Sequence, residues 1–173
     1  MNEIEQRARD FLAQKRIAVA GVSATREDAA NANYRKFKQL GYTVYPLNPK
    51  ISTFEGDVCY PNVSALPEPV DGIFVVTGPV NSQEIVRQSI DAGIKRVWMH
   101  CAFGTSPRFL KGLANRITSV SNEAIQMCED RGVTVIPGGC PMQFHGGIGH
   151  KCMRRIFKWS GGYSKPKGTL LKA

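Results

Sequence analysis

Apolar and polar positions along the chain follow two periods, one typical of strands and one typical of helices. Five short runs are mostly apolar and of strand length, and the third is nearly continuous, as in a strand buried on both faces. We predict β-strands over residues 16–21, 42–47, 72–77, 96–100 and 133–136.

Longer segments between these runs carry apolar residues at helical spacing. In the first segment Ile4, Ala8, Phe11 and Leu12 fall on one face, and in the second Gly41 marks the helix end. We predict helices over residues 3–15, 30–40, 80–92 and 121–131.

Strands and helices that alternate in this way form a parallel sheet through right-handed crossovers. The pattern therefore predicts an α/β fold: a Rossmann-like, doubly wound, five-stranded parallel sheet in three α/β/α layers. We assign residues 1–142 to a single domain that starts with the helix at 3–15 and contains an insertion at 105–118. Residues 143–173 form a basic, Gly-rich C-terminal tail.

Composition and charge fit a globular body with a cationic end. The chain is 42% hydrophobic and 21% charged, as in an ordinary folded domain. No apolar run approaches the roughly 20 residues that span a bilayer, so we expect no membrane partner. The net charge is +9, and residues 151–173 hold seven lysines and arginines and no acidic residue. Such a tail attracts nucleic acid or other phosphate-rich partners, although its simplest role is to aid solubility.

The five cysteines are odd in number and lack C-x-x-C spacing, which predicts reduced thiols in a cytoplasmic protein. A zinc site is the alternative use of Cys140 and Cys152, together with His145 and His150. Their spacing, C-x4-H-x4-H-x-C, matches none of the common structural zinc sites. We therefore predict no metal.

Two predicted strands end in residues with distinctive chemistry. The first runs into Gly21-Val22-Ser23, where Gly21 permits a tight turn and Ser23 offers an N–H and a hydroxyl to a diphosphate. The second ends in Asn48-Pro49-Lys50, whereas NAD-binding proteins carry Asp or Glu there for the ribose 2′-hydroxyl. Lys50 would attract a phosphate on the ribose, which favours CoA or NADP over NAD.

The ordered set of motifs resembles a known family. The most specific segment is 41–50 (GYTVYPLNPK), which follows the AGVS turn at 20–23 and precedes Val97-Trp98 and a Gly-x-x-Val-Ile strand that leads to Cys140. From about residue 15 to 142 the chain is similar to the stand-alone CoA-binding proteins. These proteins are themselves similar to the N-terminal CoA-binding domain of the succinyl-CoA synthetase α subunit.

This resemblance implies a CoA site built from the first two strand ends. The diphosphate would lie at the Gly-x-Ser turn, which Val22 lines, with Arg26 within reach of a phosphate oxygen. Asn48 and Pro49 would form a wall for the adenosine. Lys50 would make a charge-assisted contact with the 3′-phosphate.

The resemblance also implies contacts further along the sheet edge. Thr77 and Pro79 would meet the adenine or the pantetheine arm, although Pro79 is equally suited to start a helix. His100 stands where related proteins commonly have Gln, and it would bond either the pantetheine amides or backbone groups. Cys140 would lie near the CoA thiol. There it would either form a mixed disulfide with CoA or serve only as a packing residue.

No complete catalytic motif is visible: the chain has no Ser-His-Asp order, no paired carboxylates and no Walker lysine loop. We therefore predict a non-catalytic or accessory protein that binds CoA or acyl-CoA. One alternative is an NADP-dependent reductase or another nucleotide-binding enzyme. Another is a nucleic-acid-associated protein that acts through the basic tail. The pattern is also compatible with a homodimer, which would form through the helices that this chain adds to the alternating strand–helix core.

Overall fold

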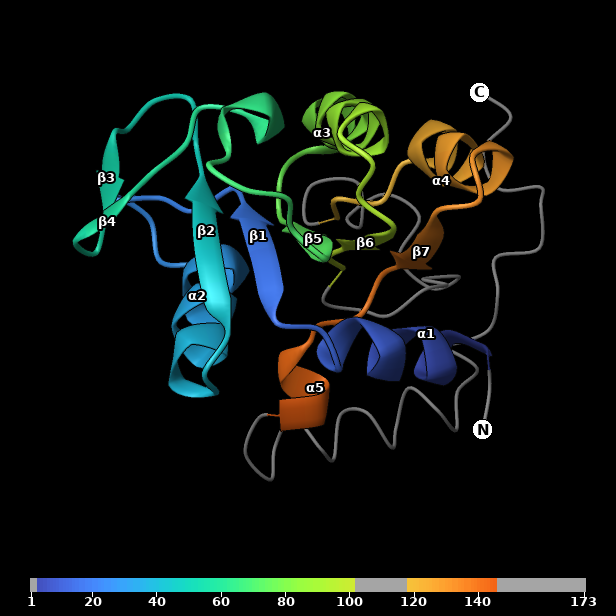
Figure 1. Ribbon diagram of the computed structural model, residues 1–173, viewed down its shortest axis with the longest axis horizontal. Helices are drawn as coiled ribbons and strands as arrows, with labels where there is room; N and C mark the ends of the chain where they lie inside the picture. Colours follow the sequence, from blue (N-terminus) through green and yellow to red (C-terminus); the bar gives the residue numbers. More distant parts are fainter. Residues whose placement is uncertain (1–2, 102–117, 146–173) are drawn as a thin grey trace.

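The central feature of the computed structural model, which describes residues 3–101 and 118–145, is one parallel sheet (Figure 1). Its five strands lie in the order β2-β1-β5-β6-β7, and all neighbouring pairs are parallel. The strands are β1 (Arg16–Ala20), β2 (Thr43–Leu47), β5 (Gly72–Val75), β6 (Arg96–Met99) and β7 (Thr134–Pro137). The predicted five-stranded parallel sheet is confirmed.

Helices cover both faces of the sheet and give the predicted three layers (Figure 1). One face carries α1 (Glu3–Leu12), α2 (Ala29–Gln39) and the short α5 (Met142–His145). The other carries α3 (Pro79–Asp91), α4 (Asn122–Asp130) and the 3-10 helix η1 (Val63–Ala65). The leading helix ends at Leu12, earlier than the predicted Lys15.

A small antiparallel hairpin, β3 (Thr53–Phe54) and β4 (Asp57–Val58), follows β2 and was not predicted. Its tight turn places Glu55 and Gly56 at positive φ, 48° and 87°. Two-residue strands are too short to show a period in the sequence, so the pattern gave no sign of them.

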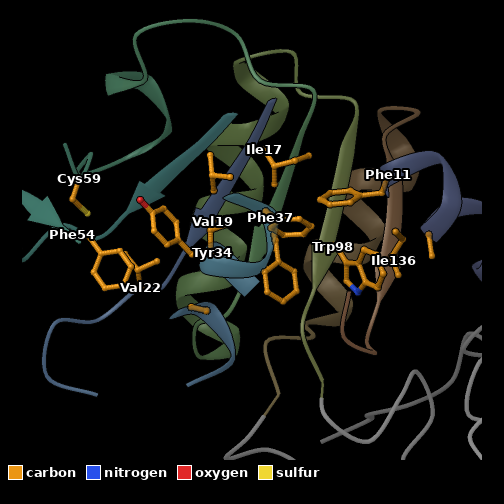
Figure 2. Packing of buried hydrophobic residues seen from close by; sticks show 14 of the residues in the cluster. Phe11, Ile17, Val19, Val22, Tyr34, Phe37, Phe54, Cys59, Trp98 and Ile136 are labelled. Carbon is orange, nitrogen blue, oxygen red and sulfur yellow. The ribbon is translucent and has the colours of Figure 1, made fainter. Parts of the chain in front are cut away.

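Strand residues alternate between two hydrophobic clusters, as the pleat requires. In β1, Ile17 and Val19 face α1 and α2, whereas Ala18 and Ala20 face the layer of α3 and η1. The first cluster is rich in aromatic rings (Figure 2). The small side chain of Ala20, at the carboxyl end of β1, lies on the second face and lines a cavity there.

Trp98 lies at the centre of the first cluster and has no exposed surface, as expected for a core residue. Its ring packs edge-on against Phe11, at 5.4 Å between centroids, and its Nε1 donates to the Gly138 carbonyl at 3.0 Å. Phe11 reaches this position because Gly72 has no side chain: a Cβ there would lie 2.8 Å from the Phe11 ring. The leading helix is therefore an integral part of the core.

The folded body extends past residue 142, where we placed the domain boundary. Gln143 is buried, and the Phe144 ring lies 5.9 Å from that of Trp98. Most of the insertion, from residue 105 to 117, and the tail from 146 onward lie outside the described residues, as do His150 and Cys152. No helix in the described ranges is long and apolar enough to cross a membrane.

The strand order creates a topological switch point in the sheet, at the carboxyl end of β1. From β1 the chain crosses to β2 on one side, and it later returns to place β5 on the other side of β1. In open α/β sheets, ligands bind outside the carboxyl ends of the strands at such a switch point. The ends of β1, β2 and β5 are therefore the first place to look for a site.

Candidate functional site

A cavity of about 680 Å³ opens at the switch point, between the carboxyl ends of β1, β2 and β5 and one side of α3. This volume lies in the range of small-molecule and cofactor sites. Seven of the eleven predicted site residues line it: Gly21, Ser23, Arg26, Asn48, Pro49, Lys50 and Thr77.

Gly21 occupies the point where the three strand ends meet. Its φ is +105°, and its N–H donates to the Leu47 carbonyl of β2 at 3.0 Å. A Cβ on Gly21 would lie 2.1 Å from the carbonyl oxygen of Val76, just after β5. Only glycine fits this position, which brings the backbone of the turn to the cavity wall.

The loop after Gly21 is held by a buried amide. The Asn31 side chain accepts from the Ser23 N–H at 2.9 Å and donates to the Ser23 and Arg26 carbonyls at 2.8 and 2.9 Å. The Ser23 hydroxyl in turn accepts from the Arg26 N–H at 3.1 Å. In this conformation the Ser23 N–H is already bonded within the protein, so the hydroxyl is what Ser23 offers to a ligand.

Two cations stand on the same side of the cavity. The Arg26 side chain is 69% exposed and pairs with Asp28 at 3.0 Å. Asp28 also caps α2 by accepting from the Ala30 N–H at 2.9 Å, so a carboxylate already occupies that helix N-terminus. Lys50 is exposed and makes no ion pair with any residue in the described ranges. A bound phosphate would therefore rely on Lys50 and on a shared Arg26.

Asn48 joins the two loops that carry these groups. Its Nδ2 donates to the Val22 carbonyl at 2.6 Å, and its Oδ1 accepts from the Lys50 N–H at 2.8 Å. The Asn48 N–H donates to the Tyr60 carbonyl at 2.9 Å. With its amide engaged in this way, Asn48 positions Lys50 beside the Gly21 turn.

Four predicted residues do not line the cavity. Val22 is buried in the cluster under α2, and Pro79 is the first residue of α3. His100 lies on the α2 face, edge-on to Phe74, and burial lowers its pKa to about 4, partly offset by Asp28. Their roles in binding stay predictions.

Cys140 is the fourth of these residues. It is 9% exposed, and its Sγ accepts from the Asn33 Nδ2 at 3.3 Å. Burial raises the pKa of the Cys140 thiol, with a smaller opposing effect of Asn33. Thiol exchange requires an accessible thiolate, so both features slow the formation of a mixed disulfide at Cys140.

The sequence analysis did not identify the residues that line the cavity on the side of α3, across from the Gly21 and Lys50 loops. Polar side chains of α3 and of the segment before η1 face the cavity there: Asn62, Asn81, Glu84 and Gln88. On a helix such residues are usually exposed to solvent. The available signal was their spacing, because positions 81, 84 and 88 fall on one face of a helix.

Comparison with known proteins assigns the chain to a family. A family model described as a CoA binding domain matches residues 15–146. The chain belongs to the CoA-binding domain family. This assignment confirms the resemblance that the motifs at 20–23 and 41–50 indicated.

Solved structures similar to this CoA-binding family member share its fold. A hypothetical protein from Pyrococcus horikoshii OT3 is 26% identical, with a TM-score of 0.68, and the match covers 83% of this chain and 90% of that one. A protein from Thermus thermophilus is 22% identical, with a TM-score of 0.63 and coverage of 88% and 99%. The search of curated proteins found no match.

A larger enzyme contains the same fold. The dinucleotide-forming acetyl-coenzyme A synthetase 1 of Ca. Korarchaeum cryptofilum is 23% identical, with a TM-score of 0.55. The match covers 70% of this chain but 25% of the synthetase. This fold therefore occurs both in chains of about this size and as part of a longer protein.

Proposed function

We propose that the protein binds CoA or acyl-CoA in the cavity at the switch point, as a non-catalytic or accessory binding protein. The diphosphate would lie at the Gly21 turn beside the Ser23 hydroxyl and Arg26, and the 3′-phosphate near Lys50. The observation that carries this proposal is the cavity itself. The Gly21 turn and Lys50, which has no ion-pair partner among the described residues, line this one cavity in a member of the CoA-binding domain family.

The composition of the cavity wall supports a binding role without chemistry. Among the described residues, the wall contains no cysteine and no histidine. His100 and Cys140 contact Phe74 and Asn33, on the side of the sheet that carries α2. A wall of cations, amides, hydroxyls and one carboxylate, without a thiol or an imidazole among the described residues, fits a carrier or accessory protein.

NADP is the second candidate ligand, because Lys50 would also attract a phosphate on the 2′ position of ribose. Thermal unfolding with CoA, dephospho-CoA, NAD and NADP distinguishes the two. A ligand that binds only the native state, at about 100 times its Kd, adds roughly 2.7 kcal/mol to stability. We expect the largest rise in the unfolding midpoint with CoA. A larger rise with NADP than with CoA would reject the proposal.

Removing the Lys50 charge tests the assignment of the 3′-phosphate. We expect Lys50→Ala to weaken CoA binding by about 1–3 kcal/mol, as for a lost charge-assisted hydrogen bond. Dephospho-CoA lacks the 3′-phosphate, so its affinity should change little. Isothermal titration of both ligands measures the difference.

Lys95 provides a matched control, because it is an exposed lysine just before β6, at the opposite end of the sheet. Lys95→Ala should leave both affinities unchanged. Equal losses for CoA and dephospho-CoA in Lys50→Ala would show that Lys50 acts elsewhere in the site.

A further inference from the structure

The cavity has two walls of different chemistry. The loop wall carries the cations Arg26 and Lys50 beside the Gly21 turn. The α3 wall carries the carboxylate of Glu84. In a site for a polyanionic ligand, a carboxylate repels phosphate and favours a part of the ligand that donates a hydrogen bond.

Glu84 is held ionised and in a fixed orientation. Arg87 approaches it as a fork, with Nη2 at 2.6 Å from Oε1 and Nε at 3.0 Å from Oε2. Gln88 donates to Oε1 at 2.7 Å and accepts from the Val63 N–H of η1 at 3.3 Å. The hydrogen bonds from Arg87 and then Gln88 lower the pKa of Glu84. The neighbouring residues thus set the direction of this acceptor.

One carboxylate oxygen of Glu84 can still accept a hydrogen bond. A carboxylate has about four lone-pair positions. Within the described residues, Oε1 accepts two of the hydrogen bonds above, whereas Oε2 accepts only that from the Arg87 Nε. Oε2 is therefore able to accept one more hydrogen bond from a ligand in the cavity.

We propose that Glu84 selects the base of the bound nucleotide by accepting a hydrogen bond from the exocyclic 6-amino group of adenine. This inference rests on the proposed function. With the phosphates at the cationic loop wall, the base and the pantetheine arm are the parts of the ligand left to meet the α3 wall, and a comparison of bases separates the two. Adenine offers an N–H donor at position 6, whereas a 6-oxo purine offers an acceptor, which the carboxylate would repel. Glu84 would thus both fix the orientation of the ligand and discriminate against 6-oxo bases.

The test compares CoA with its analogue in which hypoxanthine replaces adenine. The two ligands keep the same phosphates and differ at position 6, amino against oxo, and at the neighbouring N1, which carries a hydrogen only in hypoxanthine. We expect the wild type to bind CoA at least about tenfold more tightly, as for a hydrogen bond to a charged group. In Glu84→Gln the side chain keeps its shape, and its amide both accepts from an amino group and donates to an oxo group. The preference should therefore largely disappear in this variant.

Asp91 gives the matched control, because it also pairs with Arg87, at 3.1 Å, but does not line the cavity. Asp91→Asn should keep the full preference for CoA. Equal binding of the two ligands by the wild type, or an unchanged preference in Glu84→Gln, would overturn the role of Glu84. If the wild type bound neither ligand, the proposed function would fail and this inference with it. The unfolding midpoint of Glu84→Gln without ligand should stay close to that of the wild type, because the side chain is exposed.

Discussion

Gly21 is the residue on which the shape of the cavity depends most directly. The turn brings β1, β2 and β5 together only because no Cβ separates Gly21 from the Val76 carbonyl. Ser23, Asn31 and Asn48 then hold the loops around this point through hydrogen bonds of 2.6–2.9 Å. The positions of Arg26 and Lys50 therefore depend on backbone geometry and on the amides of Asn31 and Asn48, as well as on charge.

A methyl group at Gly21 tests this dependence. We expect Gly21→Ala to lower the free energy of unfolding by about 3 kcal/mol or more, because a left-handed backbone and a close contact are penalised together. CoA binding should fall as well, since the turn must move. Urea denaturation and titration with CoA measure the two effects.

Gly41→Ala is the control for backbone conformation alone. Gly41 has a φ of +81°, but apart from its chain neighbours no atom of the described residues lies within 4 Å of the position of its Cβ. We expect a loss of about 1–2 kcal/mol and unchanged CoA binding. Similar losses of stability in the two variants would show that the contact with Val76 relaxes.

His100 makes stability depend on pH. Its folded pKa of about 4 lies below the ordinary 6.5, because burial disfavours the charged ring. The unfolded chain therefore binds more protons between these two values. The stability due to neutral His100 is fully present above pH 6.5 and is lost as the pH falls towards 4.

The variant His100→Gln removes this titration. Between pH 7 and pH 4.5, we expect the wild type to lose about 2 kcal/mol more stability than His100→Gln. Urea denaturation at the two pH values measures this difference. Comparing the two proteins at the same pair of pH values cancels the contribution of carboxylates that do not interact with His100. Equal losses would show that His100 is solvated in the folded state.

At the scale of elements, α1 has an importance that the family match alone does not suggest. The matched residues begin at 15, yet α1 ends at Leu12 and contributes Ile4, Ala8 and Phe11 to the core. The Arg7 guanidinium also donates to the Val135 carbonyl of the edge strand β7 at 2.8 Å. The helix thus covers one edge of the sheet and fills the space above Gly72.

Truncation of Phe11 tests the contribution of α1. We expect Phe11→Ala to lower the free energy of unfolding by about 3–5 kcal/mol, the usual cost of a cavity left by a buried aromatic ring. Leu40→Ala, at a position that is 43% exposed, should cost less than about 1 kcal/mol. Chemical denaturation compares the two variants. A loss below 1 kcal/mol in Phe11→Ala would mean that α1 is dispensable for the core.

At the scale of the whole molecule, the sequence predicted what depends on local pattern. Apolar runs located all five strands, and strand alternation explains why Trp98 is buried against α1. The same alternation puts His100, two residues later, on the face of Trp98 and away from the cavity. The position of His100 on this face was therefore predictable from the sequence, whereas its role in binding stays a prediction.

Other features depend on contacts between elements that are distant in the sequence. The bond that occupies the Ser23 N–H comes from Asn31, on a helix that starts after the loop. The α3 wall is visible only once η1 is placed beside α3 and the ends of β1 and β2 are placed across the cavity from it. Glu84 and Gln88 look like ordinary solvated helix residues until that placement is known.

The burial of Trp98 provides an intrinsic optical probe of folding. Its indole is enclosed by Phe11, Phe74 and Phe144 on the face of the sheet opposite the cavity wall formed by Ala20 and Val63. In a Trp159→Phe background, the fluorescence of this single tryptophan should be blue-shifted in the native state. It should shift to the red on unfolding and stay unchanged when a nucleotide enters the cavity. Emission from Trp98 will therefore report the fraction of folded molecules in the same solution in which titration calorimetry reports occupancy.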